Sequence, residues 1–417
     1  MLHSENLTGI AAPRRGARGA TGRSGRLTGS LARLALDWRD ALLTGGGIWV
    51  IFTALRWVTA VVTEFVSEPD HGRLHSSIPG WFLLFYNWDS DFYANIAVDG
   101  YFAGDRHPNV WPAFFPGLPL AMRGLAWVGN GGELTKFSAS VAGVVLAHVF
   151  SLTATVLIFR MTSARFTRRA GVWSAVLLMT WPTAVFLNAA YTESLFLALA
   201  VAAWYSAWRG RWWLAGLLCA GASLTRLNGV LLAGALLVFL VVEMARRRTQ
   251  VRVSNFLAIA GGVLGTVAYF FYLQRNTGDW MTWPNALEDG WHRHSASFVE
   301  GFIGTLDRIS VQTDPFQRAQ SVVDAFTVVA LTLFVVYLAW RQFWPELTFT
   351  AATLYTVAAS PEYISVLRYT LTLFPVFLVG GLVLSRRREW VSAMLVTLSG
   401  VWMLLSTVLF TLDKWIG

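Results

Sequence analysis

The sequence predicts an all-α protein that crosses a membrane many times, and three observations lead to this fold class. Hydrophobic residues make up 55% of the 417 residues, charged residues only 14%, and the mean hydropathy is +0.50. A soluble domain of this size needs more charge than that to cover its surface. Aromatic residues account for 14% of the chain, with 21 Trp, which suits the aromatic belts at the two membrane–water interfaces. The third observation is a series of apolar runs separated by short arginine clusters.

The apolar runs predict about eleven transmembrane helices, each judged against the roughly 20 residues that cross a bilayer. Several runs are short and are interpreted as half-helices or as tilted pieces of broken spans, a known way to build a site at membrane depth. The runs lie near 46–66, 138–160, 171–187, 193–208, 212–224, 228–244, 254–274, 323–341, 347–360, 366–384 and 390–410.

The chain divides into a basic arm and one membrane domain. Residues 1–40 carry seven arginines among Gly, Ala and Ser, and no small-residue cleavage site follows a short apolar region. We interpret 1–40 as a disordered arm and 41–417 as a single transmembrane domain. Its two long loops, at 67–137 and 275–322, are expected on the outer side.

The arginine clusters predict the orientation in the membrane. With the arm inside, the later clusters near 160–169, 209–211, 246–252, 341 and 386–388 all fall on the same side, as the positive-inside rule requires. The net charge of +9 is therefore assigned to membrane orientation rather than to nucleic acid. The preference for Arg over Lys is typical of a GC-rich bacterial genome, so we expect a bacterial plasma membrane with a cytoplasmic N-terminus.

Several functional classes are not expected. A single cysteine, Cys219, excludes an intrachain disulfide. The sequence shows no Walker A loop, no dinucleotide-binding fingerprint and no DxD pair inside a soluble nucleotide-binding domain, so cytosolic nucleotide chemistry is not expected. Nor does it show two matching hydropathy halves of the kind that many transporters have.

The segment 87–120 is the strongest candidate site, because it places two acids among aromatic residues in an outer loop. Residues 81–97 have helix-compatible spacing and predict an amphipathic helix on the outer membrane surface. A partly desolvated carboxylate there suits a general base. Asp89 and Asp91, at i and i+2, point in different directions on a helix, so one of them is expected to reach a substrate. The spacing fits equally well a helix-capping Asp89 beside a solvated Asp91.

Two further motifs have a functional and a structural interpretation. The run Ala113–Pro119, AFFPGLP, is a shaped turn that either lines a groove or merely packs, because its prolines prevent a regular helix. Glu193 begins an apolar run, where an acid is favourable at a helix N-terminus, and it is interpreted as a cap with a possible substrate contact.

Arg226 and Arg368 are the two informative cations, because both lie at the outer ends of apolar runs. A guanidinium matches phosphate oxygens in a bidentate manner, so we favour phosphate binding. The alternatives are interfacial snorkelling and a salt bridge to Glu193 or Glu362. His292 and His294 have a ligand-like spacing, but two histidines without a nearby acid or cysteine pattern do not predict a metal site.

Taken in order, these motifs resemble the PIG-V family, the GPI mannosyltransferase 2 group within the GT-C glycosyltransferases. The pieces that carry the resemblance are WDSDFYANIAVDGY at 88–101, AFFPGLP at 113–119, NAAYTESLF at 188–196, TRLNG at 225–229 and LRYTLTLFP at 367–375. They span about residues 81–380, most of the membrane region, and they agree in order and in their expected membrane face.

The resemblance implies a GT-C-like bundle whose first large outer loop carries an acid required for transfer. That acid falls on Asp89, with Asp91 as second candidate, and the implied activity moves a sugar, by family a mannose, from a polyprenyl-phosphate carrier to an acceptor hydroxyl with inversion. Arg226 and Arg368 are then expected to hold the donor phosphate. The remaining substrate or groove residues are expected to be Trp88, Tyr101, Phe114, Phe115, Pro116, Tyr191, Glu193, Asn228 and Tyr369.

The expected partners are the lipid-linked donor, a lipid or glycan acceptor and membrane lipids, with no nucleic acid; a membrane partner subunit is left open. No cofactor or metal is expected if arginines neutralise the phosphate. Two other functions remain open: a transporter or flippase of a lipid-linked sugar, and a non-catalytic subunit of a glycosyltransferase complex. A transporter predicts acids buried near the middle of its spans, whereas the acids here cluster in an outer loop.

Overall fold

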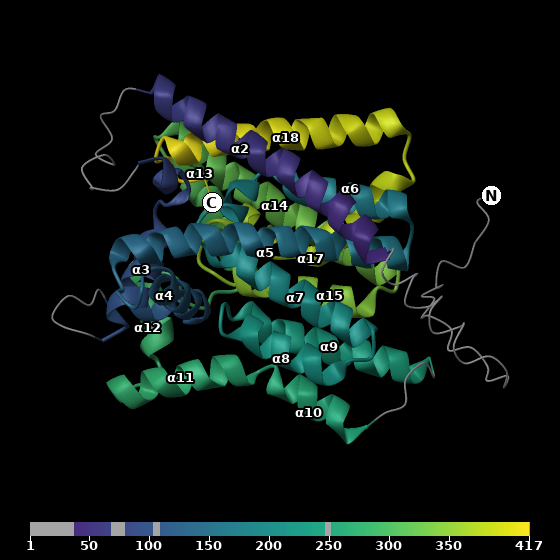
Figure 1. Ribbon diagram of the computed structural model, residues 1–417, viewed down its shortest axis with the longest axis horizontal. Helices are drawn as coiled ribbons and strands as arrows, with labels where there is room; N and C mark the ends of the chain where they lie inside the picture. Colours follow the sequence, from purple (N-terminus) through teal and green to yellow (C-terminus); the bar gives the residue numbers. More distant parts are fainter. Residues whose placement is uncertain (1–36, 68–79, 103–108, 247–251, 417) are drawn as a thin grey trace.

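The computed structural model describes residues 37–67, 80–102, 109–246 and 252–416. This part of the chain is built from helices and contains no strand, which confirms the all-α prediction (Figure 1). The arm predicted at 1–40 lies outside the described residues as far as residue 36, and residues 37–40 already belong to the first helix, which continues to Val66.

The first half of the described chain forms eight α-helices and four short 3-10 or π-helical segments, labelled η. In order they are η1 (Ala41–Gly45), α2 (Gly46–Val66), η3 (Gly80–Phe85), α3 (Asp89–Asp99), η4 (Trp111–Ala113), α4 (Gly117–Gly129), α5 (Lys136–Arg165), α6 (Arg168–Met179), η5 (Ala184–Leu187), α7 (Thr192–Trp208), α8 (Trp212–Ser223) and α9 (Asn228–Ala245).

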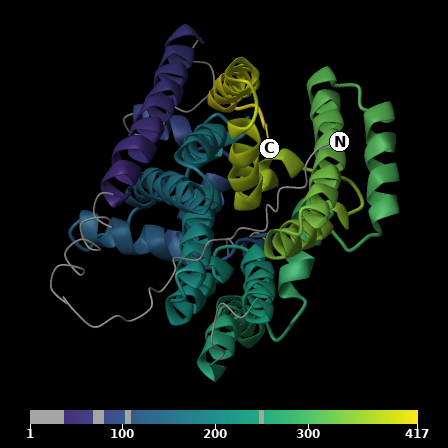
Figure 2. The same ribbon diagram turned by 90° about the vertical axis from the view of Figure 1, so that its right-hand side faces the viewer.

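The second half continues the same architecture. Its helices are α10 (Val253–Gly261), α11 (Leu264–Thr277), α12 (Thr282–Trp291), α13 (Phe298–Val311), α14 (Pro315–Trp340), α15 (Trp344–Ala358), α16 (Val366–Thr370), α17 (Phe374–Ser385) and α18 (Glu389–Thr411). Figure 2 shows α13 and α14 side by side at one edge of the bundle.

Every apolar run that predicted a span falls on a helix, but the helices differ in length. Among the described residues, five are long and apolar enough to cross a membrane, and α10 with α11 makes a sixth if the two are one span bent by 42°. The other runs form helices of fewer than 18 residues, such as α8 and α17. The breaks fall within the longer runs near 171–187, 254–274 and 366–384, whereas the short runs near 212–224 and 347–360 each form one uninterrupted helix. The chain is an integral, multi-pass membrane protein.

The long helices run back and forth, so their connections alternate between two ends of the bundle, whereas α10 continues into α11 as one bent unit (Figure 1). We call the end with α3, α4 and α12 the loop end, and the opposite end the arginine end. Helix α5 joins them, because Lys136 at its start pairs with Asp91 and Arg160 near its finish pairs with Asp37. The described connections between α5 and α6, α7 and α8, and α17 and α18 lie at the arginine end, so the three arginine clusters that they carry share one side (Figure 1). Which end faces the cytoplasm remains a prediction.

Small residues allow the helices to approach closely. A Cβ at Gly381 of α17 would lie 2.0 Å from the Ser174 hydroxyl oxygen of α6, and one at Gly216 of α8 would lie 2.0 Å from the carbonyl oxygen of Ala258 in α10. Close backbone approach through small residues is typical of helix packing in membranes, where lipid supplies no hydrophobic drive for helices to associate.

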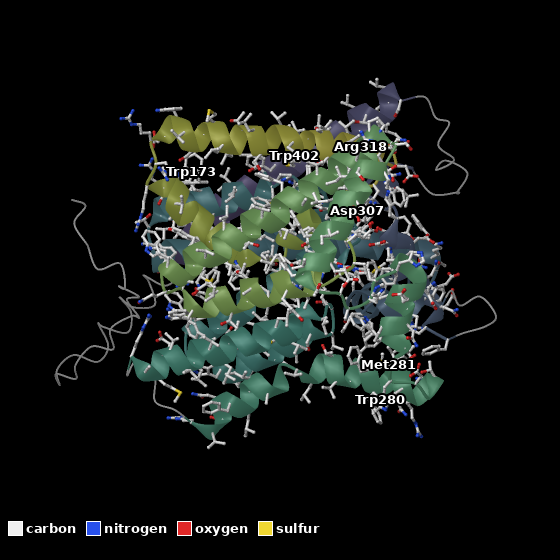
Figure 3. All side chains as sticks on the ribbon, turned by 180° about the vertical axis from the view of Figure 1, so that it is seen from behind. Trp173, Trp280, Met281, Asp307, Arg318 and Trp402 are labelled. Carbon is white, nitrogen blue, oxygen red and sulfur yellow. The ribbon has the colours of Figure 1, made fainter. Side chains whose placement is uncertain are left out.

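The outer surface is apolar along its length. Figure 3 shows Trp402 on α18 and, at the loop end, Trp280 and Met281 between α11 and α12. All three side chains are exposed. An apolar exterior with aromatic residues toward one end suits a protein surrounded by lipid.

One cation is buried in the middle of a span. Arg56, halfway along α2, is fully buried, and its described partners are neutral groups. Its Nε donates to Asn188 Oδ1 at 2.6 Å, and its Nη1 donates to the Met179 carbonyl oxygen at 2.8 Å. Asn188 also donates to His148 Nε2 at 2.8 Å, so the network ties α2 and α5 to the segment that leads into α7.

Replacing Arg56 with Met is expected to lower the stability of the protein. The change leaves Asn188 Oδ1 and the Met179 carbonyl without their donor, at a cost of about 1–3 kcal/mol for each stranded buried group. The measurement is the apparent melting temperature in detergent. Arg39→Met is the matched control, because Arg39 is exposed on the same continuous helix. An equal loss in both variants would contradict the role given to Arg56.

Candidate active site at the loop end

Asp89 begins α3 in a backbone conformation that is held from outside the helix. Trp88, directly before it, has φ of 53°, a region that residues other than glycine rarely adopt. The Asp89 backbone N–H donates to the Tyr191 hydroxyl at 3.0 Å, and that hydroxyl donates to the Asn87 carbonyl oxygen at 3.1 Å. Tyr191, itself buried, therefore fixes the turn that aims Asp89.

The Asp89 carboxylate points into the protein. Its Oδ2 accepts from Arg368 Nη1 at 3.0 Å, and the side chain is 15% exposed. Burial raises the pKa of this carboxyl above its usual value, against the opposing effect of Arg368. The helix-capping alternative does not hold, because Trp88 is the N-cap residue of α3 and no side chain caps the helix.

Asp91 points the other way, as its spacing from Asp89 predicts. Its side chain is 51% exposed and lies 2.7 Å from the Lys136 ammonium. It also accepts hydrogen bonds from Tyr86 and Asn95. The structure thus separates the two acids into one that is buried and one that is solvated.

Glu193 joins Asp89 in a buried cluster of charges. Glu193 is 1% exposed, and its Oε1 lies 2.7 Å from Arg226 Nη1 and 3.4 Å from Arg368 Nε. It does not cap α7 through its side chain. Both arginine side chains are 11% exposed, which excludes interfacial snorkelling. The salt-bridge alternative is present with Glu193, whereas Glu362 pairs with Arg308.

A third arginine, Arg293, completes the cluster and was not predicted from the sequence. It donates to the Tyr369 hydroxyl at 2.8 Å, and the guanidinium carbons of Arg226, Arg293 and Arg368 lie 5.0–5.8 Å from the centre of the Tyr369 ring. Arg293 stands between the two histidines that drew attention in the sequence. The signal that it offered was a cation on the predicted outer side, the same signal that singled out Arg226 and Arg368.

Asp324, also missed, holds the segment that carries Arg368. From within α14, its carboxylate accepts backbone N–H groups of Ser365 at 3.1 Å and Val366 at 2.7 Å. Ser365 has φ of 62°, so the turn before α16 is strained and needs such support. An acid inside a long apolar run was the available signal.

Trp415, near the end of the described chain, packs against the Arg368 side of the cluster. The Arg368 guanidinium lies 5.1 Å from the Trp415 ring, and that ring meets Trp88 edge to face at 5.5 Å. Because this contact joins residues far apart in the sequence, no local pattern could have indicated it.

The aromatic residues expected to line a groove are enclosed instead. Phe114 stacks on Phe92 at 4.7 Å, and Phe115 packs against Tyr269 at 5.0 Å. Both rings are buried, as is Tyr101, whose hydroxyl donates to the Phe114 carbonyl oxygen. These side chains shape the described part of the loop by packing.

The AFFPGLP turn also positions Arg226. The backbone N–H of Gly117, directly after Pro116 at the start of α4, donates to the Leu224 carbonyl oxygen at 2.7 Å. A Cβ at Gly117 would lie 2.6 Å from Thr225 Cγ2, so the turn docks against the TRLNG segment itself. Asn228, at the start of α9, donates to Thr353 at 3.4 Å and belongs to helix packing rather than to the charged cluster.

The two histidines of the second outer loop flank Arg293. His294 Nδ1 lies 2.9 Å from Glu288, and His292 ends α12 in a left-handed conformation. Over the described ranges, no group of three or more His, Cys, Asp or Glu side chains is placed to share a metal ion.

Gly117→Ala is expected to displace the Arg226 turn and to lower both stability and any activity of the site. An added methyl group in a filled contact costs about 1–3 kcal/mol. The control is Gly124→Ala in the same helix, where an added Cβ meets nothing within 4 Å. The control should be neutral or stabilising by up to about 1 kcal/mol, since Ala favours helix over Gly. Melting temperatures of the two variants in detergent test the difference, and equal values would contradict the docking role.

Comparison with known proteins finds relatives that match part of this chain. GPI alpha-1,6-mannosyltransferase 2 of Cricetulus griseus and of Mus musculus are each 34% identical over 159 residues, and the Homo sapiens protein is 30% identical over 161 residues. Each match covers 36% of this chain and 30% of the relative, so it spans just under a third of the relatives' length.

Two solved structures are also similar. The crystal structure of ArnT from Cupriavidus metallidurans bound to undecaprenyl phosphate matches 87% of this chain and 76% of that chain, with 16% identity and a TM-score of 0.47. The apo structure of the same protein matches 88% and 76%, with 14% identity and a TM-score of 0.48.

A family model decides the assignment, because it covers more of the chain than the individual relatives do. The model described as mannosyltransferase (PIG-V) matches residues 56–273, just over half of the 417 residues. This region contains Arg56, Asp89, the AFFPGLP turn, Glu193 and Arg226. The chain therefore belongs to the mannosyltransferase (PIG-V) family.

Proposed function

We propose that this chain is a membrane glycosyltransferase that moves mannose from a polyprenyl-phosphate carrier to an acceptor hydroxyl, with inversion and with Asp89 as general base. The observation that carries the proposal is the buried Asp89–Arg368 pair inside a cluster of three arginines. A carboxylate that is desolvated and fixed beside cations suits proton abstraction next to a phosphate leaving group.

The charges of the cluster support a phosphodiester donor. Asp89 and Glu193 offset two of the three arginines, which leaves one net positive charge. A sugar linked to a lipid through a phosphodiester carries one negative charge, so the bound donor would make the site neutral. Neutrality matters because uncompensated charge in a buried site is costly.

The proposed reaction preserves this balance. The acceptor oxygen forms a bond to the anomeric carbon from the face opposite the phosphate, and its proton passes to Asp89. The bond from the anomeric carbon to the phosphate oxygen breaks, and its electron pair stays on the phosphate, which gains a negative charge. Protonated Asp89 gives the cluster a second net positive charge at the same time.

Donor binding would also release the base. In this structure Arg368 is occupied by Asp89 and Glu193, and Arg226 by Glu193. Phosphate oxygens would compete for these guanidinium groups and loosen the hold of Arg368 on Asp89. The three arginines would then stabilise the charge that develops on the leaving phosphate, so we propose that transfer needs no metal or cofactor.

The acceptor is proposed to be a hydroxyl of a glycolipid or a cell-envelope glycan in a bacterial plasma membrane. The positive-inside rule places the arginine end in the cytoplasm and the charged cluster on the outer face. A bacterial chain meets no GPI anchor, so the activity class is carried over from the family without its acceptor.

Asp89→Asn is expected to lower the rate of mannose transfer by about 10²–10⁴-fold, the usual contribution of a general base. The assay supplies labelled polyprenyl-phosphate-mannose to membranes that contain equal amounts of wild type and variant. Asp99→Asn is the matched control, because Asp99 ends the same helix and is exposed. It should transfer at close to the wild-type rate.

Asp91 and Glu193 are the alternative candidates for the general base. Undiminished transfer by Asp89→Asn would contradict the proposal and shift the role to Asp91 or Glu193, which the corresponding Asn and Gln variants then test. A wild type that transfers no sugar from any polyprenyl-phosphate donor would favour the transporter or the partner subunit.

The rate is also expected to depend on pH through Asp89. A base must be deprotonated to act, so kcat/KM should fall as the pH drops through the pKa of the Asp89 carboxyl. Because burial raises that pKa, the fall should occur above the value of about 3.9 that is ordinary for aspartate. A pH series of kcat/KM, with Asp99→Asn as reference, measures it. A rate that stays constant down to about pH 4, close to the ordinary aspartate value, would contradict this role.

A further inference from the structure

The arginine end carries a cleft that the proposed reaction does not use. The cleft has a volume of about 480 Å³ and lies between the first turn of the first helix, the last turns of α5 and the end of α7. Figure 2 looks onto this end of the bundle. The cleft is at the opposite end of α5 from Asp89, so it is separate from the charged cluster at the loop end.

Three polar groups that line the cleft lack hydrogen-bond partners among the described residues. They are Arg160 Nε, Ser163 Oγ and Trp208 Nε1, and each of these atoms is buried. Arg160 as a whole residue is 7% exposed. Buried polar atoms in proteins almost always have a partner, so three unpartnered polar atoms around one cleft favour a polar ligand there. Two of the three can act only as donors, which indicates that the ligand accepts hydrogen bonds.

The charges around the cleft favour an anion. Arg160 pairs with Asp37 at 2.9 Å and Arg168 pairs with Asp40 at 2.9 Å, so these four charges cancel. Arg209 also lines the cleft and, within the described part of the chain, has no ion-pair partner. One net positive charge therefore remains in the cleft.

The position of the cleft matches the headgroup layer of a bilayer. Helix α5 has 30 residues and is about 45 Å long, whereas the hydrocarbon core of a membrane is about 30 Å thick. A helix of this length exceeds the hydrocarbon core by about 15 Å, so polar residues at its end can reach the headgroup layer. Arg160, Ser163 and Arg168 lie at or just after its final turns, where phospholipid phosphates are found.

We propose that this cleft binds the phosphate group of an anionic phospholipid. The phosphodiester accepts hydrogen bonds from Arg160 Nε, Trp208 Nε1 and Arg209, and its single negative charge offsets the excess cation. A free phosphate ion presents the same chemistry, and the experiment separates the two sources. The lipid bridges α5 and α7 beside the start of the first helix, which Arg168 and Asp40 already fasten to α6.

The test is native mass spectrometry of the purified full-length protein after incubation with equal amounts of phosphatidylglycerol and phosphatidylcholine. Wild type is expected to retain phosphatidylglycerol in preference. Arg209→Gln should bind it about tenfold more weakly, a change that corresponds to about 1.4 kcal/mol. Arg211→Gln is the matched control, because Arg211 lies in the same turn, carries the same charge, is exposed and does not line the cleft.

A second variant tests the hydrogen bonds without a change of charge. Trp208→Phe keeps an aromatic ring but removes the unpartnered N–H, so it should also weaken phosphatidylglycerol binding while the melting temperature of the lipid-free protein stays close to that of the wild type. Equal losses in Arg209→Gln and Arg211→Gln would overturn the proposal, since they would show attraction to the whole basic face. The same holds if wild type shows no preference for phosphatidylglycerol.

The source of the phosphate is tested by adding inorganic phosphate. If the lipid is the occupant, phosphatidylglycerol stays bound in millimolar phosphate. Its displacement, together with direct phosphate binding that Arg209→Gln abolishes, would overturn the lipid as occupant and assign the cleft to a soluble phosphate.

Discussion

The salt bridge between Asp89 and Arg368 is the interaction on which the rest of the loop end depends. It joins residues that are 279 positions apart in the chain and places both charges where water hardly reaches them. A buried charge without its partner is strongly destabilising, so each of these side chains constrains the other. The surrounding contacts serve this geometry: Tyr191 fixes the turn before α3, and Asp324 fixes the turn before α16.

The AFFPGLP turn and the TRLNG segment are separate motifs in the sequence, but they dock against each other in the structure. The described hydrogen bonds of the AFFPGLP turn do not reach the charged side chains of the cluster. Gly117 nevertheless sets the position of the segment that carries Arg226. Glu193 then links Arg226 to Arg368. The site is thus assembled from five regions of the chain, around Asp89, Glu193, Arg226, Arg293 and Arg368, and its geometry is a property of the whole bundle.

Much of the helix pattern could be predicted from the sequence, because apolar periodicity is a local property. The run near 46–66 coincides with α2, although the helix that contains it begins earlier, at Asp37. The opposite directions of Asp89 and Asp91 follow from helical geometry alone. Arg293, Asp324 and Trp415 were missed, since their partners lie far away along the chain. Phe114 and Phe115 were expected at a groove, but aromatic composition cannot distinguish a lining ring from an enclosed one.

The buried Arg56 has a consequence for how the protein is made. The helix that carries it is the first span in the described chain, whereas the carbonyl of Met179 and the amide of Asn188 that receive its hydrogen bonds belong to a much later segment. An arginine at the centre of a newly inserted helix costs about 2.5–3.5 kcal/mol on translocon-insertion scales. During synthesis the Arg56 guanidinium therefore lacks these hydrogen-bond acceptors until Met179 and Asn188 have reached the membrane. The first span can adopt its packed position only after a segment more than a hundred residues later has been made.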